Sequence, residues 1–413
     1  MTSTTGSPGP AWLKSILPRS RTATVPAGAP QPAPAIPAAA PLALLAAALR
    51  APHGASPEEL AAAIADNKAR PDLDPELVDD DGFPITSARC DEAADEAIQE
   101  EIHEWLVLNG MAELQLGEAH WRALILGTAV VRDLAGEALA QLMPVEGAPS
   151  QLRLLAVLPS AWTVEQRHAA GCWFKHTVAQ FGWPLDHLTR IDVARDATPA
   201  SILAQCAADS QGPDSRIATL LVACDSHLDQ ETVDAWAANG SLSTPATPQG
   251  RIPGEGAAGL LLTSLEGARQ VDAAVFAHLY PLVETRREVS IDSARRAQSK
   301  RITELAERAV HAGGRELTQV GHIAADTDQR IARSLELMNL ASLALPQLDT
   351  TLDVSPAGVS LGSCGAVLFL CALALARHAA LLNNAPALFM SNDDPFTCAM
   401  ALVSPPPLPA LPI

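Results

Sequence analysis

Aromatic and basic side chains are scarce in this sequence. Phe, Trp and Tyr together make up 4% of the 413 residues, and a single tyrosine occurs. Lys and Arg number 28 against 47 Asp and Glu, which gives a formal net charge of −19 at pH 7. Because phosphate backbones repel a protein of this charge, we do not expect nucleic acid as a general partner.

Long apolar runs are also absent. A bilayer-spanning helix needs about 20 apolar residues, whereas the run 33–49 is broken by three prolines and the run 365–375 is closed by Arg377 and His378. The prolines near the N-terminus also argue against a secretory signal. We therefore expect a cytoplasmic protein without a membrane span, with the periplasm left open as the alternative.

No Cys-x-x-Cys pair occurs, and the number of cysteines is odd. Most of them lie in apolar runs, where a thiol usually behaves as a small core hydrophobe. This pattern argues against a zinc site and a disulfide framework and favours a reducing compartment. The acidic stretch Asp79-Asp80-Asp81 lacks the ligand spacing of a calcium loop, so we expect no metal and no cofactor. The cysteines are Cys90, Cys172, Cys206, Cys224, Cys364, Cys371 and Cys398.

Composition separates both ends of the chain from its middle. Residues 1–55 are rich in Pro, Ala, Ser and Thr and are predicted to be a disordered tail, because they can form neither regular structure nor a core. Residues 56–150 carry apolar side chains at helical spacing, such as Ile98 and Ile102, and are predicted to be a helical N-terminal region. A Pro-rich tail, 404–413, closes the chain.

Short apolar runs alternate with helical segments in the middle of the chain. The runs 152–158 and 217–224 are typical of buried strands, and the segments 199–209 and 230–238 are predicted to be helices. This alternation predicts an α/β protein with parallel or mixed sheets covered by helices. Two successive halves of similar size, 151–265 and 266–403, indicate an internally duplicated fold.

The most specific segment lies between residues 220 and 263. Asp225-Ser226 ends one predicted strand, and Pro253-Gly254-Glu255-Gly256-Ala257 leads into the next. Glycines let the backbone turn sharply there and approach its neighbours, and Glu255 is expected to bind buried backbone N–H groups or an arginine. In this order, the two turns resemble those of the thiolase-like β-ketoacyl synthases.

Further segments resemble the same family in the same order. Residues 322–336 resemble the ketosynthase segment around the first histidine, residues 358–376 the small-residue helix after the second, and residues 387–403 the last two strands. The resemblance covers roughly residues 151–403. It implies a thiolase-like duplicated fold with αβαβα layers, to which the helical region and the disordered tail are added.

The catalytic residues of that family are absent from the matching positions. The family places a nucleophilic cysteine at the start of a buried helix, where the helix dipole and an oxyanion hole assist it. The matching helix here begins Thr198-Pro199-Ala200-Ser201. Asp326 stands near the first histidine position, Ser363 stands near the second, and the closing turn is Asn392-Asp393-Asp394-Pro395. We therefore assign no catalytic, cofactor-binding or metal-binding residue.

Relocated catalytic residues are the alternative. Cys364 sits near the start of an apolar helix and would need His322 and Asp326 beside it, whereas Ser201 would need a base. The string Asp225-Ser226-His227 contains the residue types of a triad, but consecutive side chains do not face one another as a triad requires.

The chain also resembles divergent bacterial ketosynthase-like proteins that are encoded beside type VI secretion effectors. That resemblance implies a pseudoenzyme acting as an adaptor or chaperone, which binds a protein partner such as a lipase toxin and helps load it on the secretion spike. The alternative is an acyl-transferring or condensing enzyme with relocated residues. Thiolase-like folds pair through an edge strand of the first half, so the resemblance also implies a homodimer or a heterodimer with a relative.

Overall fold

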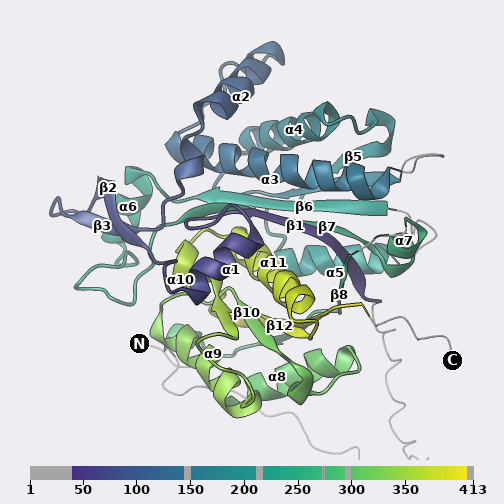
Figure 1. Ribbon diagram of the computed structural model, residues 1–413. Helices are drawn as coiled ribbons and strands as arrows, with labels where there is room; N and C mark the ends of the chain where they lie inside the picture. Colours follow the sequence, from purple (N-terminus) through teal and green to yellow (C-terminus); the bar gives the residue numbers. More distant parts are fainter. Residues whose placement is uncertain are drawn as a thin grey trace, which may run out of the picture. The chain divides into compact units, whose positions relative to one another are not determined.

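Eleven of the described strands form one mixed sheet in the computed structural model (Figure 1). The structure describes residues 40–143, 150–210, 217–271, 273, 275–293 and 299–406. The strand order is β11-β10-β12-β13-β8-β1-β7-β6-β4-β5, and β9 pairs with β13. The strands are β1 (Leu42–Arg50), β4 (Gln151–Val157), β5 (Leu188–Ile191), β6 (Ile217–Ser226), β7 (Glu255–Ser264), β8 (Ala277–Leu279), β9 (Val283–Arg286), β10 (His322–Ala325), β11 (Val354–Pro356), β12 (Ala387–Ser391) and β13 (Thr397–Ser404).

The two halves of the sheet repeat one topology. Numbered by their order in the chain, the strands of the first half lie in the order third, second, fourth, fifth, first, as β5-β4-β6-β7-β1. When β9, which lies beside β13 off the main strand order, is left out of the count, the second half repeats this order as β11-β10-β12-β13-β8. In each half the fifth strand, β7 or β13, is antiparallel to both neighbours, and the second, third and fourth strands are parallel. The predicted duplicated α/β fold is confirmed.

Helices cover both faces of each half and form a shared central layer (Figure 1). Helices α3 and α4 pack on the outer face of the first half, α8 and α9 on the outer face of the second, and α5 and α11 lie between the halves. The helices are α1 (Pro57–Ala65), α2 (Glu96–Leu108), α3 (Glu118–Leu142), α4 (Val164–Gln180), α5 (Pro199–Asp209), α6 (Gln230–Ala238), α7 (Leu265–Gln270), α8 (Ser299–Ala312), α9 (Ile331–Ala344), α10 (Ala357–Leu361) and α11 (Ala366–Leu382).

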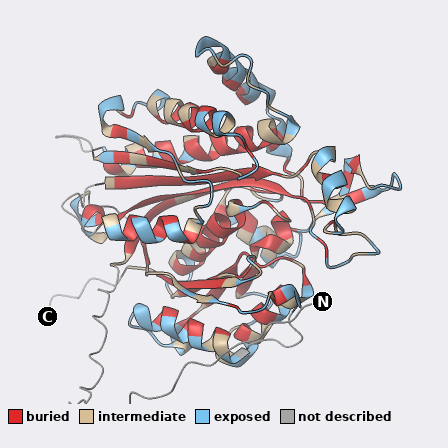
Figure 2. Ribbon diagram, turned by 180° about the vertical axis from the view of Figure 1, so that it is seen from behind, coloured by how far each residue is buried: buried red, intermediate tan, exposed pale blue. Residues whose placement is uncertain are grey.

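Helix α11 is the centre of the core. It is apolar on almost every side because it contacts both halves of the sheet, and Figure 2 shows buried residues concentrated in α11 and the strands around it. Its one arginine, Arg377, donates to the carbonyl oxygens of Leu44 at 3.1 Å and Leu45 at 2.6 Å. The register of β1 against β7 shifts between Leu44 and Ala46, so the arginine binds carbonyls at an irregularity of the ladder. No helix among the described residues is long and apolar enough to cross a membrane.

The predicted boundary of the N-terminal tail is wrong at its C-terminal end. Residues 1–39 lie outside the described residues, but Leu42–Arg50 forms β1, a buried strand that pairs with β7 and β8. Its sequence of Ala and Leu carries no strand signal, so pairing with its neighbours decides its conformation. The C-terminal tail begins one residue later than predicted, because Ser404 is the last residue of β13. Residues 407–413 lie outside the described residues.

The region 56–150 is also more than a helical addition. Helix α3 packs directly on the first half of the sheet, so this half begins at β1 rather than at residue 151. A hairpin of β2 (Asp72–Val78) and β3 (Pro84–Ser87) interrupts the helices. The acidic stretch makes its turn, where the Asp79 carboxylate accepts from the backbone N–H groups of Asp81 at 3.0 Å and Phe83 at 2.9 Å.

Glu255 has the role that its sequence position predicted. Its buried carboxylate accepts the backbone N–H of Cys90 at 2.8 Å and the hydroxyl of Ser226 at 2.9 Å. The Arg122 guanidinium donates to both carboxylate oxygens, at 2.6 and 2.8 Å. One carboxylate therefore ties α3 and the segment after β3 to the end of β6.

Candidate functional site

A cavity of about 580 Å³ lies at the carboxyl ends of the parallel strands of both halves. Its wall contains Val157 at the end of β4, Asp225 near the end of β6 and Asp326 after β10. The two central helices begin at the same wall, α5 at Pro199 and α11 at Ala366. Ligands of open α/β sheets bind at the carboxyl ends of strands, and helix N-termini present the positive ends of their dipoles. This cavity is therefore the candidate functional site.

The structure brings together the positions that were expected to have lost their catalytic residues. Ala200 in the first turn of α5, Asp326 after β10 and Ser363 before α11 all line this cavity. Because these segments are far apart in the chain, only the folded chain shows that they form one site. None of the three carries a thiol or an imidazole.

The start of α5 presents no free nucleophile to the cavity. Pro199 occupies the first helical position, and Thr198 caps the helix by accepting the Ser201 N–H at 3.2 Å. The Ser201 hydroxyl donates to the Thr198 carbonyl at 2.8 Å and accepts the Thr198 N–H at 3.1 Å. Ser201 is thus a capping residue outside the cavity wall, and the alternative in which it is a nucleophile has no base beside it in the described structure.

Burial disfavours the thiolate form of four core cysteines, of which Cys224 alone belongs to the cavity wall. Burial raises the pKa of the Cys371 thiol to about 12. Burial also raises the pKa of the Cys364 thiol well above its usual value, and the nearby Asp225 charge raises it further. Burial likewise raises the pKa of Cys206 and Cys224. The Cys224 sulfur lies against Gly127 of α3, because a Cβ added to that glycine would be only 3.1 Å from the sulfur. The thiol therefore faces α3 rather than the cavity.

The relocated site of Cys364, His322 and Asp326 does not form. Asp326 lines the cavity, but His322 and Cys364 do not. The His322 Nε2 lies 3.0 Å from the Ser355 hydroxyl, and burial lowers the pKa of this histidine to about 4. His322 is consequently a neutral, buried side chain and not a base poised near neutral pH.

Asp326 is a buried carboxyl group in the cavity wall. Its carboxylate accepts the backbone N–H groups of Asn392 at 2.7 Å and Asp393 at 3.2 Å, and the Ser391 hydroxyl also donates to it. Burial, followed by the nearby Asp393 carboxylate, raises the pKa of Asp326 to about 7. The residue therefore fastens the β12–β13 turn to β10, and its hydrogen bonds hold it in one orientation.

Asp225 and His227 form a second polar pair in the wall. The His227 Nδ1 lies 2.7 Å from the Ser363 carbonyl oxygen, and its Nε2 lies 3.9 Å from an Asp225 carboxylate oxygen. Burial raises the pKa of Asp225. Gly365 has a φ of +57°, and a Cβ there would collide with the Asp225 carboxylate, so only glycine fits this approach.

The string Asp225-Ser226-His227 does not form a triad, because the Ser226 hydroxyl donates to Glu255 instead of to His227. His227 is a site residue that its sequence context does not reveal. Gly362 and Gly365 mark a turn around Ser363 in the sequence, but only the folded chain places Ser363 beside His227. In the part of the chain that the structure describes, no group of three His, Cys, Asp or Glu side chains is placed to hold a metal ion.

Carboxylates outnumber cations in the cavity wall. Arg195 and Arg251 are its two arginines, and Arg251 lies over the Trp236 ring, 5.8 Å from the ring centroid. Opposite them stand six acidic residues, namely Asp196, Asp225, Glu284, Asp326, Asp393 and Asp394. A wall with this balance favours neutral or cationic groups over anionic ones.

Solved ketosynthase domains share this fold, although no protein-family model and no curated protein matches the chain. A ketosynthase from module 6 of the bacillaene synthase of Bacillus subtilis has a TM-score of 0.59 and 13% identity, covering 88% of this chain and 72% of that chain. An oxazolomycin ketosynthase domain of Streptomyces albus has a TM-score of 0.60 and 12% identity, covering 90% and 76%. The ishigamide ketosynthase/chain length factor has a TM-score of 0.53 and 16% identity, covering 89% and 99%. The chain therefore has the thiolase-like fold that the sequence resemblance implied.

Proposed function

We propose that this chain is a non-catalytic thiolase-fold adaptor that binds a protein partner. The supporting observation is the content of the cavity: Ala200, Asp326 and Ser363 stand where a condensing enzyme of this fold would need a thiol and two imidazoles. An acyl-enzyme requires an activated nucleophile, and the start of α5 offers only a capping threonine, a proline and an alanine to the cavity.

The resemblance to ketosynthase-like proteins encoded beside type VI secretion effectors supports a secreted effector as the partner. The first partner to test is a lipase toxin, which the chain would hold for loading on the secretion spike. The acidic cavity wall supports a role without acyl carriers, because their phosphate-bearing arms would be repelled.

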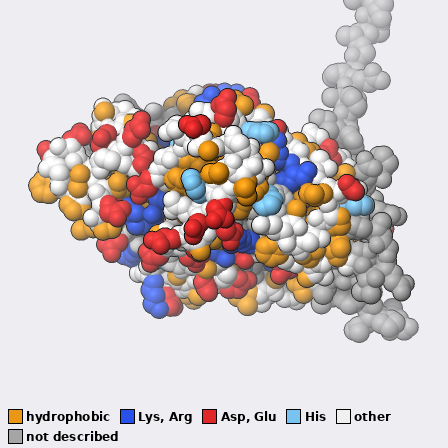
Figure 3. Space-filling model, turned by 90° about the horizontal axis from the view of Figure 1, so that it is seen from above, with side chains coloured by type: hydrophobic (Ala, Val, Ile, Leu, Met, Phe, Trp, Pro, Cys, Tyr) orange, Lys and Arg blue, Asp and Glu red, His pale blue; other side chains and the backbone are white. Residues whose placement is uncertain are grey.

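Two separate projections offer places for the partner. Helix α2 and the β2–β3 hairpin extend beyond the layered core (Figure 1). They expose large apolar side chains: Leu108 is 84% exposed, Phe83 67% and Leu73 66%. Figure 3 shows hydrophobic side chains interspersed with acidic ones on the face seen from above. Exposed apolar side chains with a polar surround are typical of protein-binding surfaces.

Affinity capture from the native host tests the proposal. We expect the wild-type chain to capture a secretion effector, and Leu108→Asp to lose it while keeping the wild-type circular dichroism spectrum. The matched control is Leu382→Asp, which changes a side chain that is 70% exposed at the end of α11. Recovery of no secretion-related protein by the wild-type chain would contradict the proposal.

The edge strand β5 is the proposed pairing surface for a homodimer or a heterodimer with a relative. It ends the strand order of the first half, and among the described strands only β4 pairs with it. Its last residue, Ile191, is 42% exposed. Sedimentation velocity should show a dimer, and Ile191→Lys should weaken it. A monomer at every concentration would exclude the homodimer. The heterodimer would then be tested by co-expressing the chain with its relative.

An enzyme with relocated residues is the second candidate, and Asp326 favours it. A carboxyl with a pKa of about 7 in a cavity has the ionisation of a general acid or base. Intact-mass spectrometry after incubation with acyl-CoA or an acyl-carrier protein tests the nucleophilic form of this candidate. An acyl adduct that is mapped to a cysteine or to Ser201 would replace the adaptor proposal.

A further inference from the structure

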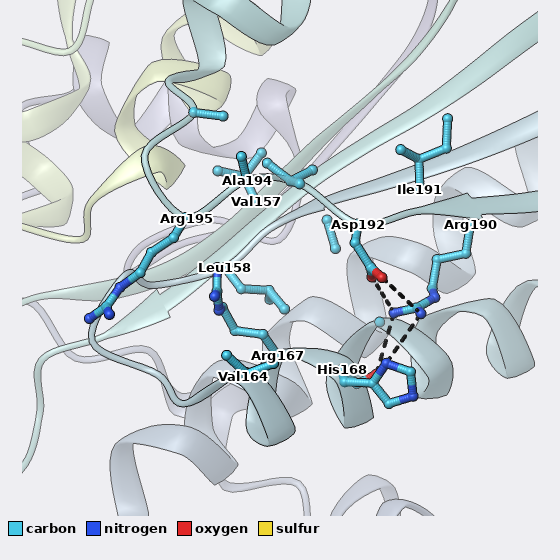
Figure 4. Close-up of a pocket in the computed structure, with 14 residues that line it drawn as sticks. Val157, Leu158, Val164, Arg167, His168, Arg190, Ile191, Asp192, Ala194 and Arg195 are labelled. Atoms are coloured by element: carbon cyan, nitrogen blue, oxygen red, sulfur yellow. Dashed lines mark hydrogen bonds and ion pairs between the residues drawn. The ribbon is translucent and has the colours of Figure 1, made fainter.

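A smaller pocket lined by arginines lies beside the edge strand β5 (Figure 4). It encloses about 150 Å³ between the first turns of α4, the ends of β4 and β5, and the loop that leads to α5. Each water molecule takes about 30 Å³ in the liquid, so this space holds a few waters or one tetrahedral oxyanion. Its ionisable side chains are those of Arg167, His168, Arg190, Asp192 and Arg195.

Arg167 contributes to the pocket lining a guanidinium with a donor left unpartnered by the described residues. Its Nε is shielded from solvent and has no hydrogen-bond partner within the described part of the chain. In Figure 4 the side chain runs from α4 toward Leu158, across the pocket wall. A buried donor without an acceptor is costly, and native proteins usually supply one from water, an ion or a ligand.

Arg190 is placed at the pocket by the packing of α4 against β5. Gly171 on α4 admits its guanidinium, since a Cβ there would lie 2.7 Å from the Arg190 Nη1. The guanidinium pairs with the exposed carboxylate of Asp192 at 2.6 and 3.3 Å, donates to the His168 carbonyl oxygen at 3.5 Å and lies 3.3 Å from the His168 Nδ1; Figure 4 draws these contacts. Because they engage both terminal nitrogens, a ligand shares these nitrogens or binds the Nε.

The local charge of this pocket is opposite to that of the chain. Arg167, Arg190 and Arg195 line the pocket together with a single carboxylate, that of Asp192, so the lining carries a formal excess of two positive charges. Of the three, Arg190 contacts Asp192, and Figure 4 shows Arg195 extending away from it. The Arg195 Nε donates to the Ser160 carbonyl at 2.5 Å, which fixes the side chain without neutralising it. The whole chain carries −19, so this excess is a local feature and not a property of the composition.

We propose that this pocket binds the phosphate group of a small molecule through Arg167 and Arg190. Guanidinium groups match phosphate oxygens in bidentate geometry. A phosphate carries about −1.5 to −2 charges at pH 7, which balances the excess, whereas one carboxylate would leave a positive charge unbalanced. The first turns of α4, which line the pocket, add the positive end of a helix dipole. The site is independent of the adaptor proposal.

Calorimetric titration of the full chain tests the site, with inorganic phosphate and glycerol 3-phosphate as the two probes and sodium chloride holding the ionic strength constant. We expect saturable one-to-one binding of at least one probe, and a loss of affinity of about tenfold or more in Arg167→Gln and in Arg190→Gln. Tighter binding of the ester indicates that the pocket holds the phosphate of a larger molecule, and tighter binding of the free ion indicates phosphate itself.

The matched control is Arg308→Gln, which changes an exposed arginine on α8 in the other half of the chain. It should bind both probes as the wild-type chain does, and circular dichroism should show that all three variants are folded. The proposal is overturned if neither probe binds the wild-type chain saturably, or if Arg167→Gln binds as tightly as the wild type.

Discussion

Glu255 shows what one side chain holds together. Its carboxylate accepts from Arg122, Ser226 and the Cys90 backbone, and the Glu255 side chain has no exposure to solvent. Breaking a buried ion pair by removing one partner leaves the other charge uncompensated. The glutamate at this turn therefore has a structural role, because it joins three segments of the chain.

Arg122→Met should lower the free energy of unfolding by about 3–5 kcal/mol, because it leaves Glu255 charged and buried. Urea unfolding followed by circular dichroism measures this change. Arg132→Met is the control on the same helix: its pair with Glu101 is partly exposed, so the loss should stay below about 1 kcal/mol. Equal losses in the two variants would mean that the Glu255 network contributes no more than a surface pair.

Asp326 should make stability depend on pH. Its pKa is about 7 in the folded chain and near 3.9 when unfolded. Between these values the folded chain holds a proton that the unfolded chain has released, so the free energy of unfolding falls as pH rises. The Asp326→Asn side chain has the shape of the protonated acid but does not bind or release a proton in this pH range.

The variant should therefore gain stability relative to the wild type from about pH 4 to pH 7, by at most about 1.4 kcal/mol per pH unit, with no further gain above pH 7. The buried His322, whose pKa is lowered to about 4, has the opposite dependence in this range, but it is present in both proteins and cancels in the difference. Urea unfolding at several pH values measures the difference in the free energy of unfolding between the variant and the wild type. Parallel stability curves would show that Asp326 is ionised throughout.

At the scale of elements, helix α5 begins at the cavity wall, where the family resemblance implies a catalytic helix. Its first turn lines the cavity and Ala200 is 8% exposed. A thiol at a helix N-terminus is commonly acidified to a pKa of about 7.5 or lower. The helix should therefore activate a cysteine that is introduced at this position.

Ala200→Cys should create a thiol that iodoacetamide alkylates at pH 7 faster than any native cysteine. The native residue Cys172 is the internal reference, because it is the one cysteine in the described structure that is not buried. Peptide mapping by mass spectrometry follows both sites in one sample. Alkylation of the introduced thiol no faster than that of Cys172 would mean that this helix start does not stabilise a thiolate. We expect no condensing activity, since Asp326 and Ser363 still replace the imidazoles.

Local signals in the sequence predicted some elements and missed others. Helix α5 has the predicted bounds, because Thr198 and Pro199 mark its start in the sequence itself. Strand β1 was missed, because its Ala and Leu residues become a strand only by pairing with β7 and β8. The residues at the family's catalytic positions could be read from single positions in the sequence, whereas the Asp225–His227 pair and the arginine pocket depend on contacts between distant segments.

At the scale of the whole molecule, the two halves share one sheet and one core. Strand β8 pairs with β1 of the first half and with β13 of the second, so the backbone ladder crosses between the halves. The central cluster combines residues of β7 with residues of α11 and β12. Two units that share a ladder and a core should unfold together rather than in sequence.

The distribution of tryptophan makes this cooperativity measurable. Every tryptophan precedes residue 240, so tryptophan fluorescence reports on the first half. Leu388 lies on β12, fully buried in the outer core of the second half. Leu388→Ala removes buried methyl groups there and should cost about 2–5 kcal/mol. If the halves are one cooperative unit, the urea midpoint seen by fluorescence must fall as far as the midpoint seen by circular dichroism, with an unchanged slope. A fluorescence midpoint that stays at the wild-type value, while circular dichroism shows an earlier partial transition, would make the halves independent and would allow each to bind a partner alone.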